Sequence, residues 1–257
     1  MMRRSSMVFA LCLPAFVTAA NAETVKVDGV SAALELPSGY CKLSRRDPVE
    51  KSMYELQDRV QAGHNIVVMI AFPCEKIKAL HKGVMSPQYA IWLMQAPKGT
   101  VTRIPDSVDR RSVLDIWAKT IPKFETSELV GDIERRAQRE GKKIKIDSTG
   151  VIGRDDNAVY LGLAGMVTRR AGEESIASVT GMTLLSNRFF SLNLYDRFES
   201  RATFDQLLTK AKDALARAVS LSATMAPDKS FPPGMQPVKP APNRPPLREK
   251  PQEQASL

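Results

Sequence analysis

The chain has 257 residues, of which 43% are hydrophobic and 25% are charged. These proportions are ordinary for a folded globular protein, so they exclude a wholly disordered chain and a small scaffold that depends on many disulfides. The length suits one large domain or two small ones, and the net charge of +9 favours anionic partners.

The first 22 residues have the pattern of an export signal. Arg3 and Arg4 precede a short apolar run, and Ala20-Asn21-Ala22 carries small residues where signal peptidase cuts. The run is too short to cross a bilayer, so we expect cleavage before Glu23 and a mature chain without a transmembrane segment. The residues after Arg4 do not fit the twin-arginine motif, which favours the general secretory route. The mature protein is therefore expected in the periplasm or outside the cell, with its charge lowered from +9 to +7.

The first elements of the mature chain are a strand and a capped helix. Residues Val30–Leu36 alternate in polarity toward their end and stop at a Pro-Ser-Gly turn, which predicts a strand. A helix is expected from Pro48 to Ala62, because Asp47 can cap it and Pro48 suits the first helical position. Glu50 is placed to reach back to the cap.

The next segments predict the interior of a sheet and two covering helices. Residues Ile66–Phe72 are apolar at every position, as in a strand buried on both faces in the middle of a sheet. A further strand is expected at Tyr89–Met94. Two amphipathic helices should follow over about residues 107–120 and 127–140. The apolar side of the first comprises Val113, Ile116, Trp117 and Ile121.

The second half predicts an antiparallel meander closed by a helix. Four strands are expected, around Ile144 and Ile146 and over Ala158–Val167, Ile176–Leu185 and Phe189–Leu194. Short polar turns separate them, and Asp155-Asp156-Asn157 is interpreted as one of these turns. An amphipathic helix from Thr203 to about Ser220 should lie across the sheet. The predicted class is α+β, with a mainly antiparallel sheet packed by helices as an α/β sandwich.

A proline-rich tail ends the chain. Residues 227–257 hold nine of the 17 prolines and almost no large aliphatic residue, so they cannot bury enough apolar surface to offset the entropy of ordering. We expect a disordered tail that acts as a spacer, as a ligand for a proline-binding partner, or as a solubilising end. The predicted organisation is a signal peptide over residues 1–22, one α+β domain over 23–226 and the tail.

The order of elements resembles that of a known group of folds. A first strand followed by Leu36-Pro37-Ser38-Gly39-Tyr40, then a helix, a meander and a closing amphipathic helix is similar to the α/β sandwiches of the PsbP/Mog1/DcrB group. The two helices expected between Ser107 and Glu140 would be an insertion in that pattern. The resemblance implies a small exported or adaptor-like module that binds and does not catalyse, and it carries over no functional residue.

Only Cys41 and Cys74 remain after signal cleavage, which removes Cys12. Two cysteines in an oxidising compartment usually pair, and both follow predicted strands, so we expect a disulfide. The alternative is a metal site, since His64 and His81 lie in the same region and supply ligand types that zinc uses. Their spacing matches no zinc signature, and no cofactor is predicted.

Basic residues cluster in the middle of the chain. Arg135, Arg136, Arg139, Lys142 and Lys143 follow one another over the end of a predicted helix, and Arg110 and Arg111 lie on the preceding helix. They form either a solvated face that complements the helix dipole or a docking patch for an anionic surface. Too few aromatic residues are interleaved for stacking on nucleic-acid bases, so no nucleic-acid partner is expected.

The sequence contains no recognisable catalytic motif. The Gly-x-Ser-x-Gly elbow, the His-Glu-x-x-His zinc motif and the glycine-rich phosphate loop are missing. We therefore expect an exported, non-enzymatic binding or accessory module whose partner is an anionic envelope component or an envelope protein. A hydrolase or metal-binding protein that uses His64 and His81 is the alternative.

Overall fold

The protein is represented by a computed structural model that describes residues 22–27, 29–61, 63–84, 90–99, 104–105, 107–121, 135, 138–139, 143–169 and 172–225. For residues 143–149 and 169 the backbone alone is described. Residues 1–21 of the expected signal peptide, most of the second expected helix and the tail therefore lie outside the described residues.

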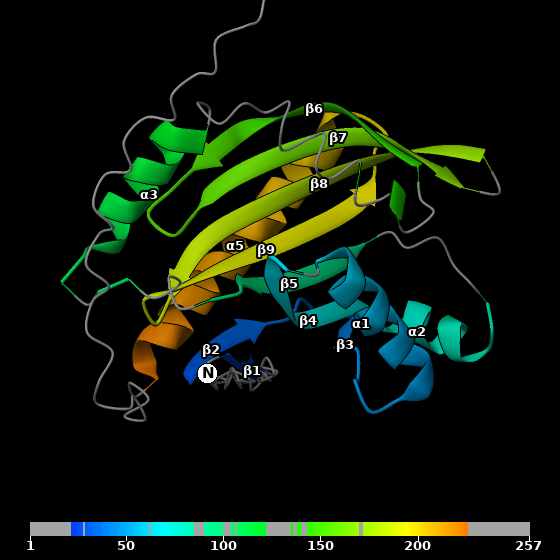
Figure 1. The fold of residues 1–257 in the computed structure, drawn as a ribbon, viewed down its shortest axis with the longest axis horizontal. Helices are drawn as coiled ribbons and strands as arrows, with labels where there is room; N and C mark the ends of the chain where they lie inside the picture. Colours follow the sequence, from blue (N-terminus) through cyan, green and yellow to red (C-terminus); the bar gives the residue numbers. More distant parts are fainter. Residues whose placement is uncertain are drawn as a thin grey trace, which may run out of the picture.

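Among the described residues the strands form two antiparallel sheets (Figure 1). The large sheet has seven strands in the order β3-β4-β5-β9-β8-β7-β6, and the small sheet pairs β1 with β2. The strands are β1 (Ala22–Val27), β2 (Val30–Glu35), β3 (Tyr40–Lys42), β4 (Asn65–Pro73), β5 (Ile91–Pro97), β6 (Lys143–Arg154), β7 (Val159–Arg169), β8 (Gly172–Leu185) and β9 (Arg188–Arg197). Strands β6 to β9 form the expected meander, each antiparallel to the next in sequence.

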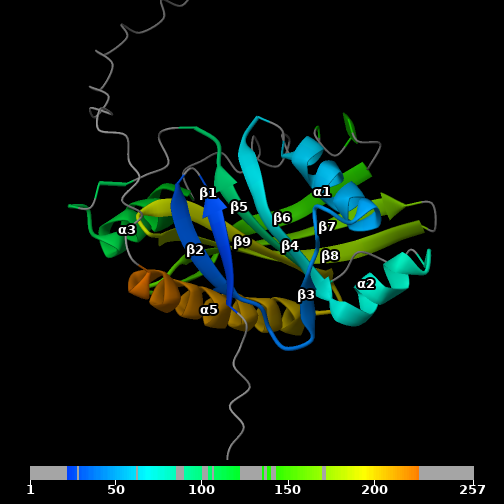
Figure 2. The same ribbon diagram turned by 90° about the horizontal axis from the view of Figure 1, so that it is seen from below.

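Helices cover both faces of the large sheet. Within the described residues they are α1 (Pro48–Val60), α2 (Cys74–His81), α3 (Arg110–Thr120) and α5 (Arg201–Thr224). The long helix α5 crosses behind the sheet, whereas α1 and α2 lie in front of it near β3 and β4 (Figure 1). The hairpin of β1 and β2 lies beside α5 (Figure 2). The expected α+β class with a C-terminal helix across the sheet is confirmed.

Helix α5 packs through small and branched apolar residues. Leu207, Ala211 and Leu215 repeat at four-residue spacing and are buried against the sheet, as expected for the apolar side of an amphipathic helix. The approach to the sheet is close at Gly181 of β8, where an added Cβ would meet the Leu215 side chain and the ring of Tyr160. No larger residue fits there without displacing one of these neighbours.

Strand β4 is buried on both faces, as expected, but it is second from the edge of the sheet and not central. Met69 and Ala71 point into the core shared with α5 and the β1–β2 hairpin, while Ile70 and Phe72 point into a second core with α1. Burial on both faces arises from these layers, and β3 pairs with only the last three residues of β4.

Three local expectations were wrong. Ile116 was placed on the apolar side of α3 but is 61% exposed, and Leu114 is buried in its place. Helix α1 ends at Val60, before Ala62. Glu50 does not reach back to the helix cap; it accepts a hydrogen bond from the Ser44 N–H and contacts His81. The Glu50 side chain points away from the start of its own helix, because its partners Ser44 and His81 lie before α1 and at the end of α2.

Candidate binding groove

The Cys41–Cys74 disulfide joins the edge of the sheet to α2. Cys41 lies in β3 opposite Phe72 of β4, and Cys74 is the first residue of α2, directly after β4. The two Cα atoms are 4.9 Å apart and the disulfide is formed, which confirms the expected pairing. The disulfide holds the short strand β3 against the end of β4, where helix α2 begins.

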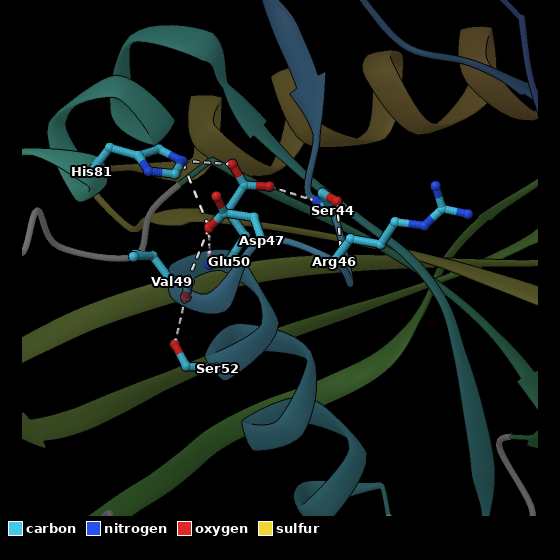
Figure 3. A network of polar contacts seen from close by, with 7 residues as sticks. All are labelled: Ser44, Arg46, Asp47, Val49, Glu50, Ser52 and His81. Atoms are coloured by element: carbon cyan, nitrogen blue, oxygen red, sulfur yellow. Dashed lines mark hydrogen bonds and ion pairs between the residues drawn. The ribbon is translucent and has the colours of Figure 1, made fainter.

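A polar network holds the turn between β3 and α1 (Figure 3). Asp47 caps α1 by accepting hydrogen bonds from the N–H groups of Val49 and Glu50 at 2.9 and 3.1 Å, as the sequence predicted. The Arg46 N–H donates to the Ser44 hydroxyl at 3.1 Å. Arg46 therefore takes part in the turn through its backbone N–H alone. Its side chain extends away from the network, and the residue is exposed.

Glu50 links the turn to the end of α2. The residue is 8% exposed. Its carboxylate accepts from the Ser44 N–H and lies 2.8 Å from Nε2 of His81, the last residue of α2. Asp47 lies 4.0 Å from the same nitrogen. The hydrogen bond that the Glu50 carboxylate accepts from His81 is the main reason that the pKa of His81 is raised above its usual value, and the charges of Asp47 and Glu50 add to the effect. The contact between His81 and Glu50 thus connects α2 to α1.

Asp47, Glu50 and His81 form the candidate metal-ligand cluster among the described residues, with ligand atoms within 4.8 Å of one another. Each member already has a structural partner. Asp47 caps α1, and Glu50 bonds both the Ser44 N–H and His81. A cation here would replace these bonds, so the arrangement is better explained as a structural network.

Tyr54 and Arg45 bind backbone groups of β4 in the part of the strand that β3 does not pair with. The Tyr54 hydroxyl donates to the Leu43 carbonyl at 3.2 Å and accepts from the Ile70 N–H at 3.3 Å. Burial is the main reason that the pKa of Tyr54 is raised, so the hydroxyl keeps the proton that it donates. The Arg45 guanidinium lies 4.0 Å from the centre of the Tyr54 ring and donates to the Val67 carbonyl at 2.8 Å. Polar groups of the edge strand are thereby satisfied by side chains.

A groove of about 770 Å³ lies beside this edge. Its lining comes from β1, from the segment after β3, from Tyr54 and from the first half of β4. Four cationic side chains and one carboxylate take part, namely Lys26, Lys42, Arg45, Arg46 and Glu23. Lys42 pairs with Glu23 at 2.8 Å and Arg45 pairs with Asp58 at 2.9 Å. In the part of the chain that the structure describes, the Arg46 guanidinium has no ion-pair partner.

The two histidines are not brought together. His64 directly precedes β4, and its carbonyl accepts from the Lys98 N–H, while His81 ends α2, which follows β4. Strand β4 and helix α2 therefore lie between them in the chain, and His64 is not a member of the cluster that His81 forms with Asp47 and Glu50. A site that uses both residues is not formed in this structure.

The described part of the predicted basic patch lies toward the opposite edge of the sheet from the groove. Arg110 and Arg111 begin α3, which is tied to β6 by an ion pair between Asp115 and Arg154. Arg111 lies 3.7 Å from Asp156, and burial lowers the pKa of Arg110. The remaining members are Arg135 and Arg139, which are exposed, Lys143, which begins β6, and Arg136 and Lys142, which lie outside the described residues.

The groove was not anticipated from the sequence. Strand β1 and helix α2 were not predicted, and the groove joins Lys26 of β1 to cations that lie 16 to 20 residues further along the chain. One signal was available: Lys42, Arg45 and Arg46 immediately precede the Asp47 cap, which marks a basic turn between a strand and a helix. Among the described helices, none has the length and apolar character needed to span a membrane.

Comparison with known proteins adds a distant likeness in fold. No protein-family model matches the chain, and a search of curated proteins finds no match. The solution structure of cyanobacterial PsbP (CyanoP) from Synechocystis sp. PCC 6803 aligns over 77% of this chain and 94% of that chain, with 11% identity and a TM-score of 0.35. At this identity and TM-score no fold assignment, function or residue role is transferred from that protein.

Proposed function

We propose that this chain is an exported, non-enzymatic binding or accessory module that docks on an anionic partner in the cell envelope through the groove beside β1. The observation that carries the proposal is the charge of the groove lining, which holds four cations and one carboxylate. Lys42 and Arg45 have ion-pair partners, whereas Arg46 is exposed without one among the described residues. Such a concave basic surface attracts and orients anionic groups.

Two features support export. The Cys41–Cys74 disulfide is typical of proteins that fold in an oxidising compartment. Strand β1 begins at Ala22, and its first buried residues are Val25 and Val27, so cleavage before Glu23 would leave the packed part of the strand intact. The intact mass of the exported protein should correspond to a chain that begins at Glu23. A species that keeps Met1 or carries acyl chains would contradict export of a free mature domain.

Charge reversal at Arg46 tests the groove. The mature protein is titrated with a fluorescent acidic peptide, with peptidoglycan and with phosphatidylglycerol vesicles, each at several salt concentrations. Binding should weaken as salt screens the exposed charges, and Arg46→Glu should weaken it further. Lys210→Glu is the matched control, because it makes the same change in charge at an exposed position of α5. Equal effects of both variants, or no effect of Arg46→Glu on any probe, would overturn the proposal.

The basic patch from Arg110 to Lys143 is a second candidate surface for the same function. Its test is the triple variant Arg135→Glu, Arg136→Glu and Arg139→Glu. Arg135 and Arg139 are exposed, and substitutions at exposed positions usually change stability by less than about 0.5 kcal/mol, so lost binding would reflect the surface itself. Wild-type binding by this variant at low salt would leave the patch as a solvated face.

A further inference from the structure

The groove runs between the edges of two strands. Its lining includes the consecutive residues Val25, Lys26 and Val27 from β1 and Ile66, Val67 and Val68 from β4. Side chains of successive strand residues point to opposite faces of a sheet. Consecutive residues line one groove together when a strand turns its edge, and not one face, toward the groove.

The outer edge of β1 carries open backbone groups. Two residues connect β1 to β2, and Val27 lies opposite Val30, so these two flank the turn as a hydrogen-bonded pair. In an antiparallel ladder only every second pair of opposite residues exchanges hydrogen bonds. Thr24 and Ala33 form a pair that does not, so Thr24 directs its N–H and C=O away from β2. Ala33 likewise directs its backbone away from β1, because its N–H donates to the Ser222 hydroxyl of α5 at 3.4 Å.

Within the described residues, neither the N–H nor the C=O of Thr24 has a hydrogen-bond partner. The small sheet contains no strand beyond β1 on this side in the part of the chain described. Polar groups on an open strand edge are a template for pairing with another extended chain. The edge of β1 therefore meets the main requirement for strand addition.

The facing wall is closed to the same kind of pairing. The Val67 carbonyl accepts from Arg45, and the N–H and C=O of Ile70 are bonded to Tyr54 and to the Leu43 N–H. Along this edge of β4 these three groups are thus bonded to the side chains of Arg45 and Tyr54 and to the backbone of Leu43. A segment that enters the groove can pair with β1 and meets cationic side chains on the other side.

We propose that the segment recognised in the groove is an extended acidic peptide of a partner protein, which adds a strand to the outer edge of β1. This inference rests on the proposed function and names its partner class. Backbone pairing at Thr24, which lies between the lining residues Glu23 and Val25, supplies the register. Arg46 and the other cations of the groove select acidic side chains. Peptide recognition by strand addition combines affinity from main-chain hydrogen bonds with specificity from alternate side chains.

Thr24→Pro tests the pairing directly. Proline removes the N–H that points away from β2 and leaves the β1–β2 ladder in place, which an edge position tolerates. A fluorescent acetylated octapeptide of alternating threonine and glutamate is the probe, and Thr24→Ala is the matched control. We expect Thr24→Pro to weaken binding about threefold to tenfold, the usual effect of one net hydrogen bond, and Thr24→Ala to bind as the wild type does.

The peptide offers an independent test should Thr24→Pro unfold the protein. Methylation of alternate backbone nitrogens of the octapeptide should abolish binding in one register and leave it intact in the other, because an added strand uses every second N–H. Equal binding of both methylated peptides would overturn strand addition. If Thr24→Pro folds and binds normally while Arg46→Glu still weakens binding, strand addition fails and the groove function stands. If Arg46→Glu has no effect on any probe, the proposed function itself fails.

Discussion

Removal of the Cys41–Cys74 disulfide should be the most damaging change near the groove that leaves the core untouched. The double variant Cys41→Ser and Cys74→Ser changes one exposed and one half-buried side chain, so it creates no large cavity. Strand β3 has three residues and pairs with β4 alone. Its attachment thus depends on a short ladder and on this covalent bond.

The magnitude follows from the loop that the bond closes. The cysteines are 33 residues apart, and constraining a loop of that length in the unfolded chain is worth about 4 kcal/mol at 25 °C in the chain-entropy treatment. That figure is an upper value, since native strain subtracts from it. For a domain of this size each kcal/mol shifts Tm by about 2–4 °C, so a fall in Tm of about 8–15 °C is expected.

Urea unfolding of the oxidised protein, the reduced protein and the double variant measures this effect. The reduced wild type should match the double variant, and the m-value should rise in both because the unfolded chain becomes less compact. A loss below about 1 kcal/mol in both would show that β3 and α2 are held by their other contacts and would refute the reasoning. A loss in the variant alone would point to the serine substitutions and not to the bond.

Three further outcomes are expected. Tyr54→Phe leaves the Leu43 carbonyl and the Ile70 N–H without their bonds to the hydroxyl, and should lower the free energy of unfolding by about 1–3 kcal/mol. Urea unfolding measures this loss, and an unchanged free energy would show that water replaces the hydroxyl. The raised pKa of His81 means that its contact with Glu50 stabilises the fold fully below about pH 6.5. The Tm advantage of the wild type over His81→Gln should therefore shrink as pH rises through that pKa, and a constant difference between pH 5.5 and 8.5 would contradict the contact. Gly181→Ala overpacks the interface with α5 and should cost about 1–3 kcal/mol in chemical denaturation, whereas Gly150→Ala, where a Cβ meets no neighbour within 4 Å, should cost far less.

Local patterns determined much of the architecture. The capped start of α1 at Pro48, the apolar run that became β4, the meander from β6 to β9 and the amphipathic helix α5 are all readable from neighbouring residues. Each depends on periodicity, capping or turn chemistry over a short stretch. The pairing of Cys41 with Cys74 was also predictable, because cleavage of the expected signal leaves these two cysteines alone.

The groove depends on tertiary structure because its residues come from segments that no local rule connects. Glu50 looked like part of a helix cap, and its actual partner His81 lies 31 residues further on. The position of β4 near an edge depends on which strands pair, and that choice leaves Tyr54 and Arg45 to satisfy the strand's backbone. The amino-acid sequence by itself determined the class of fold, the predicted export and the disulfide; long-range strand pairing decided where the charges meet, since contacts between distant residues leave no periodic signal in the chain.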